Sequence, residues 1–548
     1  MRSWAAIYAA LQLLPWGAVV QAQPTVGAVA LPGSEADERL RLAAPATNGA
    51  SATAGTFGAV GAFRRPARLT FDTTSRRLQL VLLAPELRLV SNSGLPFSIN
   101  EGTLWAGRGT NRLVTGGFAI TAGPFDLQLA PQHTTSENRR FQVIPFPQGT
   151  TTPSRSVWAN PFHPPASSID LPYRPGDQPL ARTVIGQSHL TLSLPRVRLG
   201  LSTEHQWWGP AMRHPLLLGA SSEGFPHLFV ETARGLSTPL GQLSAQWLLG
   251  TLRESPVFDN AAANNRRALN GAVVALTPRG DSALTLGIMR LVMSSSAPRG
   301  LPFSRSLDLF RSVGQPVQAR LPVPVGGVQR DQITALFARY VFPAAGFEGY
   351  LEWARFAEPV SLADLLEYPG YSQGYTMGLQ YSRATRAGTL RLAAEATNTE
   401  PDASIRVRPV ATSYTSRTVP QGFTHRGRML ANPLGPGASG QWFAADLFAS
   451  RLRLGAFAGR IRWDNATLWE PIIPQVKLED ITLLAGLRGS LRVGPARLAS
   501  RVGVEYTSAV RLSYLYQSKL LNWSTGENGG VDLPNRTLAI TWSTIAFR

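Results

Sequence analysis

From residue 77 onwards, hydrophobic and polar residues alternate in short stretches that end at turn residues. Residues 187–194 show the pattern clearly, because Leu190, Leu192 and Leu194 are separated by polar side chains. A period of two places successive side chains on opposite faces of a strand, so that one face is apolar and the other polar. The chain is therefore predicted to be rich in half-exposed β-strands.

The same alternation recurs along the chain and predicts about eighteen strands, with sixteen as the alternative count. Many are about 9–12 residues long, which suits a strand that crosses a membrane at a tilt. An imperfect pattern near Gly455 and Gly459 predicts a β-bulge there. The predicted strands are 77–90, 113–121, 123–131, 187–194, 197–202, 226–235, 242–254, 268–277, 283–294, 331–342, 347–356, 374–383, 389–397, 441–449, 453–463, 481–492, 497–517 and 536–547.

The connections between these strands alternate between tight and long. Residues 195–196 and 278–282 are tight turns, whereas residues 295–330 and 398–440 are long loops. A soluble sandwich has no reason to alternate so regularly, but an outer-membrane barrel has short periplasmic turns and long extracellular loops. The pattern predicts an all-β fold, a transmembrane antiparallel β-barrel with both chain ends in the periplasm.

The composition agrees with a barrel and excludes several other classes. The chain has 548 residues, of which 44% are hydrophobic and 16% are charged, against about 25% charged residues in an ordinary soluble domain. No run of about 18 apolar residues follows the first 25 positions, which excludes a helical membrane protein. The absence of cysteine excludes a disulfide framework, a thiol nucleophile and a thiolate metal site.

The N-terminal residues read as an export signal. Arg2 precedes a mostly apolar stretch, residues 4–20, and Val20-Gln21-Ala22 fits a small-x-small cleavage site. We expect a cleaved signal peptide over residues 1–22 and a flexible or periplasmic lead-in over 23–76, where residues 35–41 could form a short helix. The barrel then covers residues 77–548, and the predicted location is the outer membrane of a Gram-negative bacterium.

The formal net charge of +19 points to a polyanionic partner. An exported protein does not ordinarily meet DNA, so we expect no nucleic acid and favour a glycan or a lipid head group. Nearly all of the charge is arginine, and part of it alternates into the predicted lumen. An inward ladder that includes Arg391, Glu395, Arg501 and Glu505 would brace a wide barrel, and the alternative is a substrate filter.

Two motifs resemble those of a known family. The first is a strand ending in Trp207-Trp208-Gly209-Pro210, followed by an apolar segment, small polar residues and an aromatic-Pro step at Phe225-Pro226. The second, in residues 419–435, has a Gly-aromatic-Thr-x-Arg-Gly pattern and then a Pro-Leu-Gly turn. Its matching residues are Gly422, Phe423, Thr424, Arg426, Gly427, Arg428 and Pro433 to Gly435.

In this order and inside a barrel pattern, the two motifs resemble the Wzi family of capsule assembly proteins. The resemblance covers about residues 77–548. It implies an outer-membrane barrel, closed or plugged inside, that acts as a lectin and helps capsular polysaccharide attach at the cell surface. It implies neither catalysis nor a cofactor. Expected partners are a surface polysaccharide, possibly acidic, together with outer-membrane lipid, lipopolysaccharide and the barrel assembly machinery.

The motif residues are the candidates for glycan binding. Trp207 and Trp208 could stack on sugar rings, or they could anchor the loop by packing. His425, Arg426 and Arg428 could clasp uronate or phosphate groups, or they could form a solvated basic loop or dock on lipopolysaccharide. The remaining motif residues are expected to be structural: Gly209, Pro210, Phe225, Pro226, Gly422, Phe423 and Gly427.

Other functions find less support in the sequence. His205, His214 and His227 lack the close spacing of a metal site. Glu204 and Glu223 could be imagined as a glycosidase pair, but nothing in the sequence fixes their separation. A porin-like diffusion channel would share the barrel pattern and is the main alternative, and an enzyme acting on lipid or glycan is the next. No catalytic residue, metal or cofactor is predicted.

Overall fold

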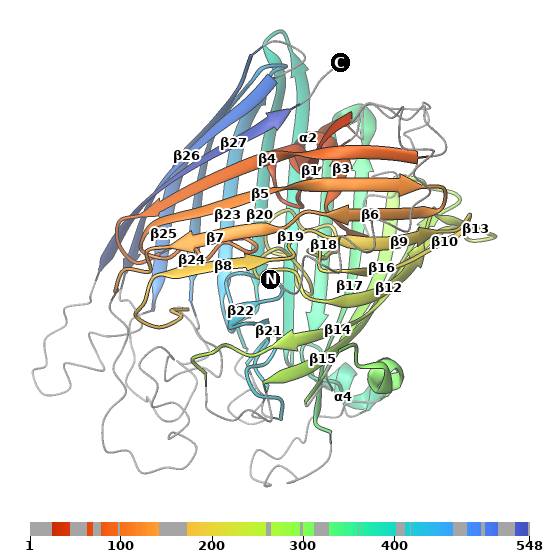
Figure 1. The fold of residues 1–548 in the computed structure, drawn as a ribbon. Coiled ribbons are helices and arrows are strands. Elements are labelled where there is room, and N and C mark those ends of the chain that lie inside the picture. The colour runs from red at the N-terminus through yellow and green to blue at the C-terminus, as the bar shows by residue number, and fades with distance from the viewer. Residues whose placement is uncertain are drawn as a thin grey trace, which may run out of the picture.

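Over the residues that it describes, a computed structural model of the chain shows a closed antiparallel β-barrel of 18 strands (Figure 1). The strands form one ring because β27 (Leu533–Ile545) pairs with β4 (Leu78–Asn92), for example at Thr537 and Asn92. Closure gives each wall strand two neighbours, so its backbone groups are paired, as a lipid environment requires. The structure describes residues 25–43, 63–69, 78–96, 99–141, 173–258, 265–295, 300–311, 328–359, 361–401, 412–416, 418–463, 479–494, 499–512 and 532–545.

Each predicted strand corresponds to one strand of the wall, and three of these are broken into two ladders. The predicted fold class and the count of about eighteen are confirmed. Between β4 and β27 the wall strands are β5 (Gly109–Ala122), β6 (Phe125–Leu129) with β7 (Gln132–Ser136), β8 (Leu180–Val184) with β9 (His189–Ser193), β10 (Val197–Ser202), β12 (His227–Thr232) with β13 (Leu236–Thr238), β14 (Gly241–Arg253), β15 (Arg266–Pro278), β16 (Leu284–Ser295), β17 (Arg330–Phe342), β18 (Phe347–Arg355), β19 (Gln373–Thr385), β20 (Gly388–Asn398), β23 (Ser439–Phe448), β24 (Leu452–Arg462), β25 (Ile481–Val493) and β26 (Ala499–Leu512).

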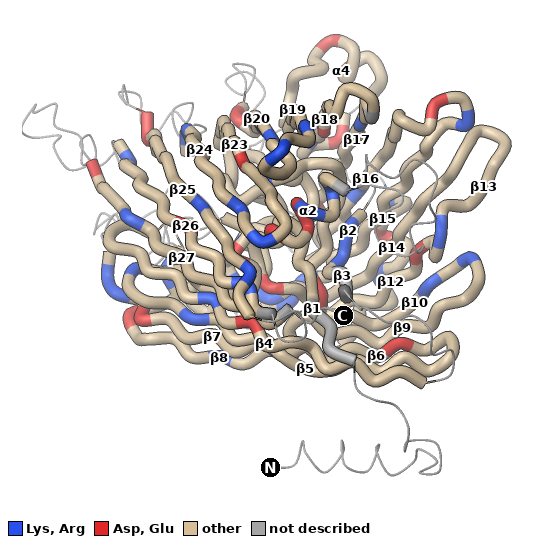
Figure 2. Tube along the Cα trace, turned by 90° about the horizontal axis from the view of Figure 1, so that it is seen from above, with Lys and Arg blue, Asp and Glu red and all other residues tan. Residues whose placement is uncertain are grey.

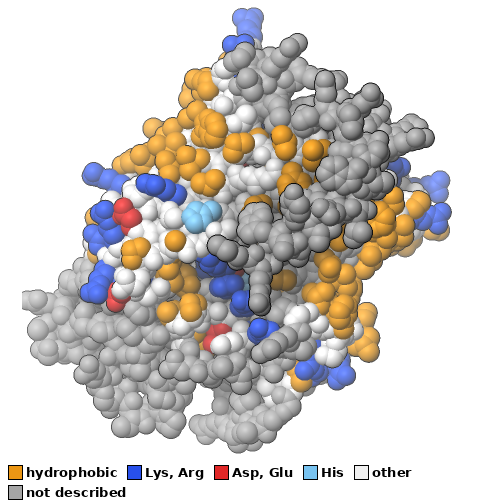
Figure 3. Space-filling view, in the orientation of Figure 1, with side chains coloured by type: hydrophobic (Ala, Val, Ile, Leu, Met, Phe, Trp, Pro, Cys, Tyr) orange, Lys and Arg blue, Asp and Glu red, His pale blue; other side chains and the backbone are white. Residues whose placement is uncertain are grey.

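The period-two pattern matches the two faces of this wall. On β16, Leu286 and Ile288 are exposed on the outside, whereas Met289 and Leu291 are buried in the lumen. Figure 3 shows hydrophobic side chains gathered on the outer surface. Apolar side chains thus face the lipid, and the lumen face carries the charged and polar alternates along with a buried apolar cluster.

The predicted bulge near Gly455 and Gly459 is wrong. The ladders from β24 to β23 and to β25 run through both glycines without a shift in register. At Gly455 a Cβ atom would collide with the carboxylate of Asp446 on the neighbouring strand. The glycine therefore makes room for a buried carboxylate. The register shift that does occur lies in β4, between Leu83 and Glu86.

Short elements lie in the lumen, at the rims and on the outer surface of the wall. Inside the ring lie β1 (Thr25–Ala30), which pairs with β3 and β4, and α2 (Glu35–Ala43) (Figure 2). The described part of the expected lead-in thus lies within the barrel, while the predicted signal peptide, residues 1–22, lies outside the described residues. No helix in the described ranges is long and apolar enough to cross a membrane. The other short elements are β2 (Phe63–Arg64), β3 (Ala67–Leu69), β11 (Trp207–Trp208), η3 (Phe303–Phe310), η4 (Pro343–Ala345), α4 (Leu362–Glu367), β21 (Thr424–His425) and β22 (Arg428–Met429).

Candidate functional site

The first motif lies in a loop that folds into the barrel rather than away from it. We call residues 203–226 the Trp-Trp loop. Two wall carboxylates hold its backbone: Glu395 accepts the N–H groups of Met212 (2.7 Å) and His214 (2.7 Å). Glu352 accepts those of Ala211 (2.8 Å) and Leu216 (3.0 Å). Buried N–H groups need acceptors, and the wall supplies them here.

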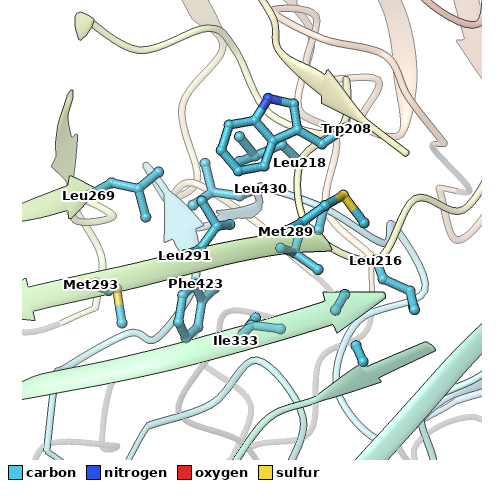
Figure 4. Packing of buried hydrophobic residues seen from close by; sticks show 14 of the residues in the cluster. Trp208, Leu216, Leu218, Leu269, Met289, Leu291, Met293, Ile333, Phe423 and Leu430 are labelled. Atoms are coloured by element: carbon cyan, nitrogen blue, oxygen red, sulfur yellow. The ribbon is translucent and has the colours of Figure 1, made fainter. Parts of the chain in front are cut away.

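The second motif lies in what we call the His-Arg loop, residues 418–438, which packs on the Trp-Trp loop. The N–H of Gly219 donates to the carbonyl of Leu430 (2.8 Å), and the hydroxyl of Ser221 donates to that of Ala431 (2.7 Å). Their side chains form one buried apolar cluster with the inner wall (Figure 4). The members labelled there are Trp208, Leu216, Leu218, Leu269, Met289, Leu291, Met293, Ile333, Phe423 and Leu430.

Both tryptophans of the first motif are fully buried. The indole N–H of Trp207 donates to the carbonyl of Ala211 (3.0 Å), and Trp208 donates to the side chain of Gln246 (2.7 Å). The guanidinium of Arg64 lies 4.9 Å from the ring centre of Trp207, a cation–π contact. Since neither indole exposes a face, sugar stacking does not fit this structure, and packing does.

Steric constraints explain why glycine occupies its positions in the two motifs. Gly209 has a φ of +88°, and a Cβ there would collide with the carboxylate of Glu352. Gly427 has a φ of +80° beside the ring of Tyr173. Pro210 accepts a hydrogen bond from Arg41 through its carbonyl (2.8 Å). Two further motif residues also belong to the packing, Gly422 with a φ of +51° and buried Phe225. The adjoining Pro226 is exposed and leads into β12.

Two arginines and a histidine surround Glu223 at the rim of the barrel where the long loops lie. His425 Nε2 lies 3.3 Å and Arg426 Nε 2.7 Å from Glu223 Oε1, and Arg182 forms a further ion pair with the same carboxylate. Burial alone would raise the pKa of Glu223, but His425 and the two guanidiniums outweigh it and lower the pKa to about 2. Glu223 is therefore ionised at physiological pH.

Positive charge exceeds negative charge around this carboxylate. Burial lowers the pKa of Arg426, and the nearby guanidiniums of Arg182 and Arg253 lower it further, against Glu223. Arg428 donates to the carbonyl of Gly102. We call Arg182, Arg253, Arg426 and Arg428 with Glu223 the rim cluster. The side chains of Arg182 and Arg426 keep 37% and 32% of their surface exposed, so solvent reaches them.

The sequence indicated only part of this cluster. Arg182 lies on β8, Arg253 ends β14, and Tyr173 lies before β8, so none adjoins a motif. Tyr173 packs edge-on against Trp105 at 5.1 Å between ring centres. Only pairing between distant strands brings these residues to Arg426 and Arg428. Arg406, Arg408 and Arg417, which would extend the same loop, lie outside the described residues.

The other titratable candidates are held in separate ion pairs. Glu204 binds His189 Nδ1 (2.7 Å) and lies near Arg65 (3.6 Å). Burial opposes its charge, but these cations outweigh burial and lower the pKa of Glu204 to about 2. His205 is buried, which lowers its pKa to about 4, and His214 lies beside Glu395 (3.2 Å). Within the described part of the chain, no three His, Asp or Glu side chains converge as a metal site would need.

Charged groups also fill the lumen at the end of the barrel where the tight turns lie. On α2, Glu38 pairs with Arg391 (2.9 Å) and Arg453 (2.5 Å), which also contact Asp446 on β23. Glu35 pairs with Arg501 (2.8 Å). The inward arginines were expected to pair along the wall with Glu395 and Glu505. Arg391 and Arg501 instead hold α2, while Glu395 accepts backbone N–H groups of the Trp-Trp loop. Arg497, a further inward arginine of the ladder predicted from the sequence, lies outside the described residues.

Comparisons with known proteins agree with both motifs and the fold. Residues 177–455, about half of the chain, match the sequence profile of the family described as Capsule assembly protein Wzi. No curated protein matches the chain by sequence. The outer-membrane protein Wzi of Escherichia coli, described as a carbohydrate-binding β-barrel involved in group 1 capsule assembly, has a similar structure. It is 13% identical with a TM-score of 0.52, and the match covers 85% of this chain and 84% of that one.

Other outer-membrane barrels are less similar. OccAB2 of Acinetobacter baumannii is 9% identical with a TM-score of 0.38, covering 84% of this chain and 98% of its own. OprD of Pseudomonas aeruginosa is 10% identical with a TM-score of 0.36, covering 86% and 96%. The profile match includes both motifs, which the barrel brings together in its lumen. The chain therefore belongs to the Wzi family of capsule assembly proteins.

Proposed function

We propose that this protein is an outer-membrane lectin that binds acidic surface polysaccharide at the rim cluster and helps to hold capsular-type polysaccharide at the cell surface. The rim cluster carries this proposal, because Arg182 and Arg426 share the carboxylate of Glu223, both are partly exposed, and Arg253 and Arg428 add positive charge nearby. Guanidinium groups bind carboxylates and phosphates with two parallel hydrogen bonds. An acidic glycan supplies such groups repeatedly along its chain.

Two aromatic rings lie beside the arginines. Tyr173 is half-buried against Gly427 and packs on Trp105. An aromatic face binds the apolar face of a sugar ring while charged neighbours bind its acidic substituents. Tyr173 and Trp105 therefore take the stacking role first considered for Trp207 and Trp208. The Wzi protein of Escherichia coli, with the same fold, is described as carbohydrate-binding, which supports a glycan as the ligand.

A binding role fits the site better than catalysis. A glycosidase needs one carboxylic acid that stays protonated so that it can protonate the leaving oxygen. The pKa values of Glu204 and Glu223 are both lowered to about 2, so neither holds a proton at neutral pH. We therefore propose a non-enzymatic function that needs no cofactor.

A binding role also fits the lumen better than diffusion does. The helix α2 lies within the wall (Figure 2), and a packed apolar cluster joins the Trp-Trp and His-Arg loops to inward side chains of the wall. A porin-like channel would need an open path along this axis. We expect no stable, large open-channel current when the protein is placed in a planar bilayer. Such a current would favour the channel instead.

The binding test removes the two exposed arginines together. In the full-length protein, Arg182→Ala with Arg426→Ala should strongly reduce binding of a uronate-containing polysaccharide while leaving the folded barrel intact. A matched control is Arg279→Ala with Arg386→Ala, which removes two exposed arginines from the tight turns at the other end. In cells, the first pair should move polysaccharide from the cell-bound to the shed fraction. Unchanged binding and retention would overturn the proposal.

The wider setting is also part of the proposal. We place the protein in the outer membrane after export through the signal peptide at residues 1–22, with lipid, lipopolysaccharide and the barrel assembly machinery as partners. Outer-membrane barrels of this kind place short turns in the periplasm, so the rim cluster would face the cell exterior. Labelling of intact cells at an engineered cysteine near the rim tests this orientation, because the chain has no cysteine of its own.

A further inference from the structure

The loop between β16 and β17 folds back over the outer surface of the barrel. Inward and outward residues alternate on β16, and Met289, Leu291 and Met293 lie in the luminal cluster. Arg290, Val292 and Ser294 therefore point outward. The described part of this loop, residues 300–311 with η3, contacts these outward side chains. It thus lies on the side of the wall that faces lipid.

Hydrogen bonds fix η3 to polar positions on that surface. The side chain of Asn270 on β15 donates to the carbonyls of Arg305 (2.9 Å) and Ser306 (2.6 Å). Ser294 donates to Asp308 (2.7 Å), and Arg290 donates to the carbonyl of Arg311 (2.7 Å). These are polar groups on the outside of a membrane barrel, and η3 covers them.

An apolar contact completes the attachment. Leu309 packs on Val292, next to the outward side chains of Trp247 and Ala272. Asp308 is buried and also pairs with Arg330 at the start of β17 (2.9 Å). The inner face of η3 therefore packs against the wall.

The outer face of η3 is strongly apolar. Phe303, Leu307 and Phe310 expose 60%, 67% and 79% of their surface. They continue the exposed apolar surface of the wall, which on β16 consists of Leu286 and Ile288. In place of the outward Asn270, Arg290 and Ser294, the molecule presents two phenylalanines and a leucine.

The length of β16 places η3 near the edge of the apolar band. Leu284 and Ser294 are ten residue steps apart on β16, which is about 33 Å along a strand. At a tilt of about 40° this spans about 25 Å, the height of the apolar band of an outer-membrane barrel. In a band that begins at Leu284, Ser294, which donates to Asp308 of η3, lies near the end, and the side chain of Arg311 is 60% exposed.

We infer that η3 is an interfacial lipid-binding segment whose Phe303, Leu307 and Phe310 insert among the acyl chains of the outer leaflet. The segment shields polar wall positions from lipid and extends the apolar band over β14 to β17. The continuity of its exposed face with the lipid-facing wall selects lipid as the occupant. This inference is independent of glycan binding at the rim cluster.

Site-directed spin labelling tests it in the full-length protein, which has no native cysteine. Leu307→Cys and Phe310→Cys each carry one label, with the protein in vesicles of phosphatidylcholine and phosphatidylglycerol. Ile288→Cys on the outer wall is the lipid control, and Leu240→Cys in the tight turn before β14 is the water control. Accessibility is measured to oxygen, which dissolves in lipid, and to a water-soluble nickel complex.

Labels at 307 and 310 should match the label at 288, with an oxygen-to-nickel ratio several-fold above that at 240. A ratio like that at 240 would overturn the inference, because η3 would then lie in water. Protection of both labels from both reagents would also overturn it, since the face would then be covered by protein, such as a second copy of the chain.

Discussion

The two ends of the barrel lumen are filled by different chemistry. At the end with the tight turns, α2 is held by ion pairs, in which Glu38 meets Arg391 and Arg453. At the end with the long loops, the Trp-Trp and His-Arg loops form a buried apolar cluster, and wall carboxylates accept backbone N–H groups of the Trp-Trp loop. Side-chain charge fixes one end, and shape with backbone pairing fixes the other.

This difference has consequences for how each end responds to its surroundings. Ion pairs weaken when a partner is protonated, so α2 should be sensitive to pH. A packed cluster depends on volume, so the loops should be sensitive to truncation of a buried side chain. The long-loop end is therefore part of the folded core, and α2 is a more separable insert.

The largest effect on stability is expected at Glu395, which accepts hydrogen bonds from the backbone of the Trp-Trp loop. Glu395→Ala leaves the N–H groups of Met212 and His214 and the hydroxyl of Tyr350 without their acceptor. Breaking a buried charged arrangement costs about 3–5 kcal/mol of unfolding free energy. Urea unfolding followed by tryptophan fluorescence measures it. Glu395→Gln keeps one acceptor oxygen and should lose less unfolding free energy than Glu395→Ala. Equal losses in the two variants would contradict this account.

The apolar cluster predicts the next effect. Trp208→Ala should lower the free energy of unfolding by about 3 kcal/mol, the lower end for a buried tryptophan, because the loop around the cavity can partly relax. Trp542→Ala is the matched control, since Trp542 is 37% exposed on the outer wall. Similar losses in both variants would show that the cluster does not hold the loops.

At the other end, Glu38→Gln should loosen α2 with little effect on the wall. Burial opposes the charge of Glu38, but Arg488, Arg453 and Arg391 outweigh it and hold its pKa far below the usual range. The stabilisation is thus complete above the ordinary pKa of about 4.3 and is lost as the pH falls through the lowered value.

Hydrogen exchange of residues 35–43 measures this effect. At neutral pH, exchange should be faster in Glu38→Gln than in the unmodified protein. In the unmodified protein, exchange corrected for intrinsic rates should become faster only under strong acid. Glu367→Gln, on the exposed helix α4, is the control. Unchanged protection in Glu38→Gln would mean that ion pairs do not hold α2.

The smallest effect on stability is expected at the rim cluster. Its ion pairs are partly exposed, and exposed pairs contribute about 0–1 kcal/mol. Arg182→Ala with Arg426→Ala should therefore barely shift urea unfolding, although it should reduce glycan binding. A large loss of stability would place these arginines with the core loops and would make the binding test ambiguous.

The sequence by itself determined the barrel. Alternation with a period of two and turn residues are local signals, so the wall strands and the order of tight turns and long loops could be read directly. The two motifs also indicated the family, because residue types at fixed spacing need no knowledge of the fold. The one local error concerned Gly455, where the glycine makes room for Asp446 on another strand.

Only the tertiary structure decided what the side chains do. Trp207 and Trp208 are packing residues because their loop folds inward, and no local pattern distinguishes an inward loop from an outward one. Arg182, Arg253 and Tyr173 reach Arg426 through the pairing of distant strands. Residues 35–43 lie inside the barrel because arginines on four distant strands face Glu35 and Glu38 there. These outcomes depend on contacts between residues far apart in the chain, which fixed spacing along the sequence does not encode.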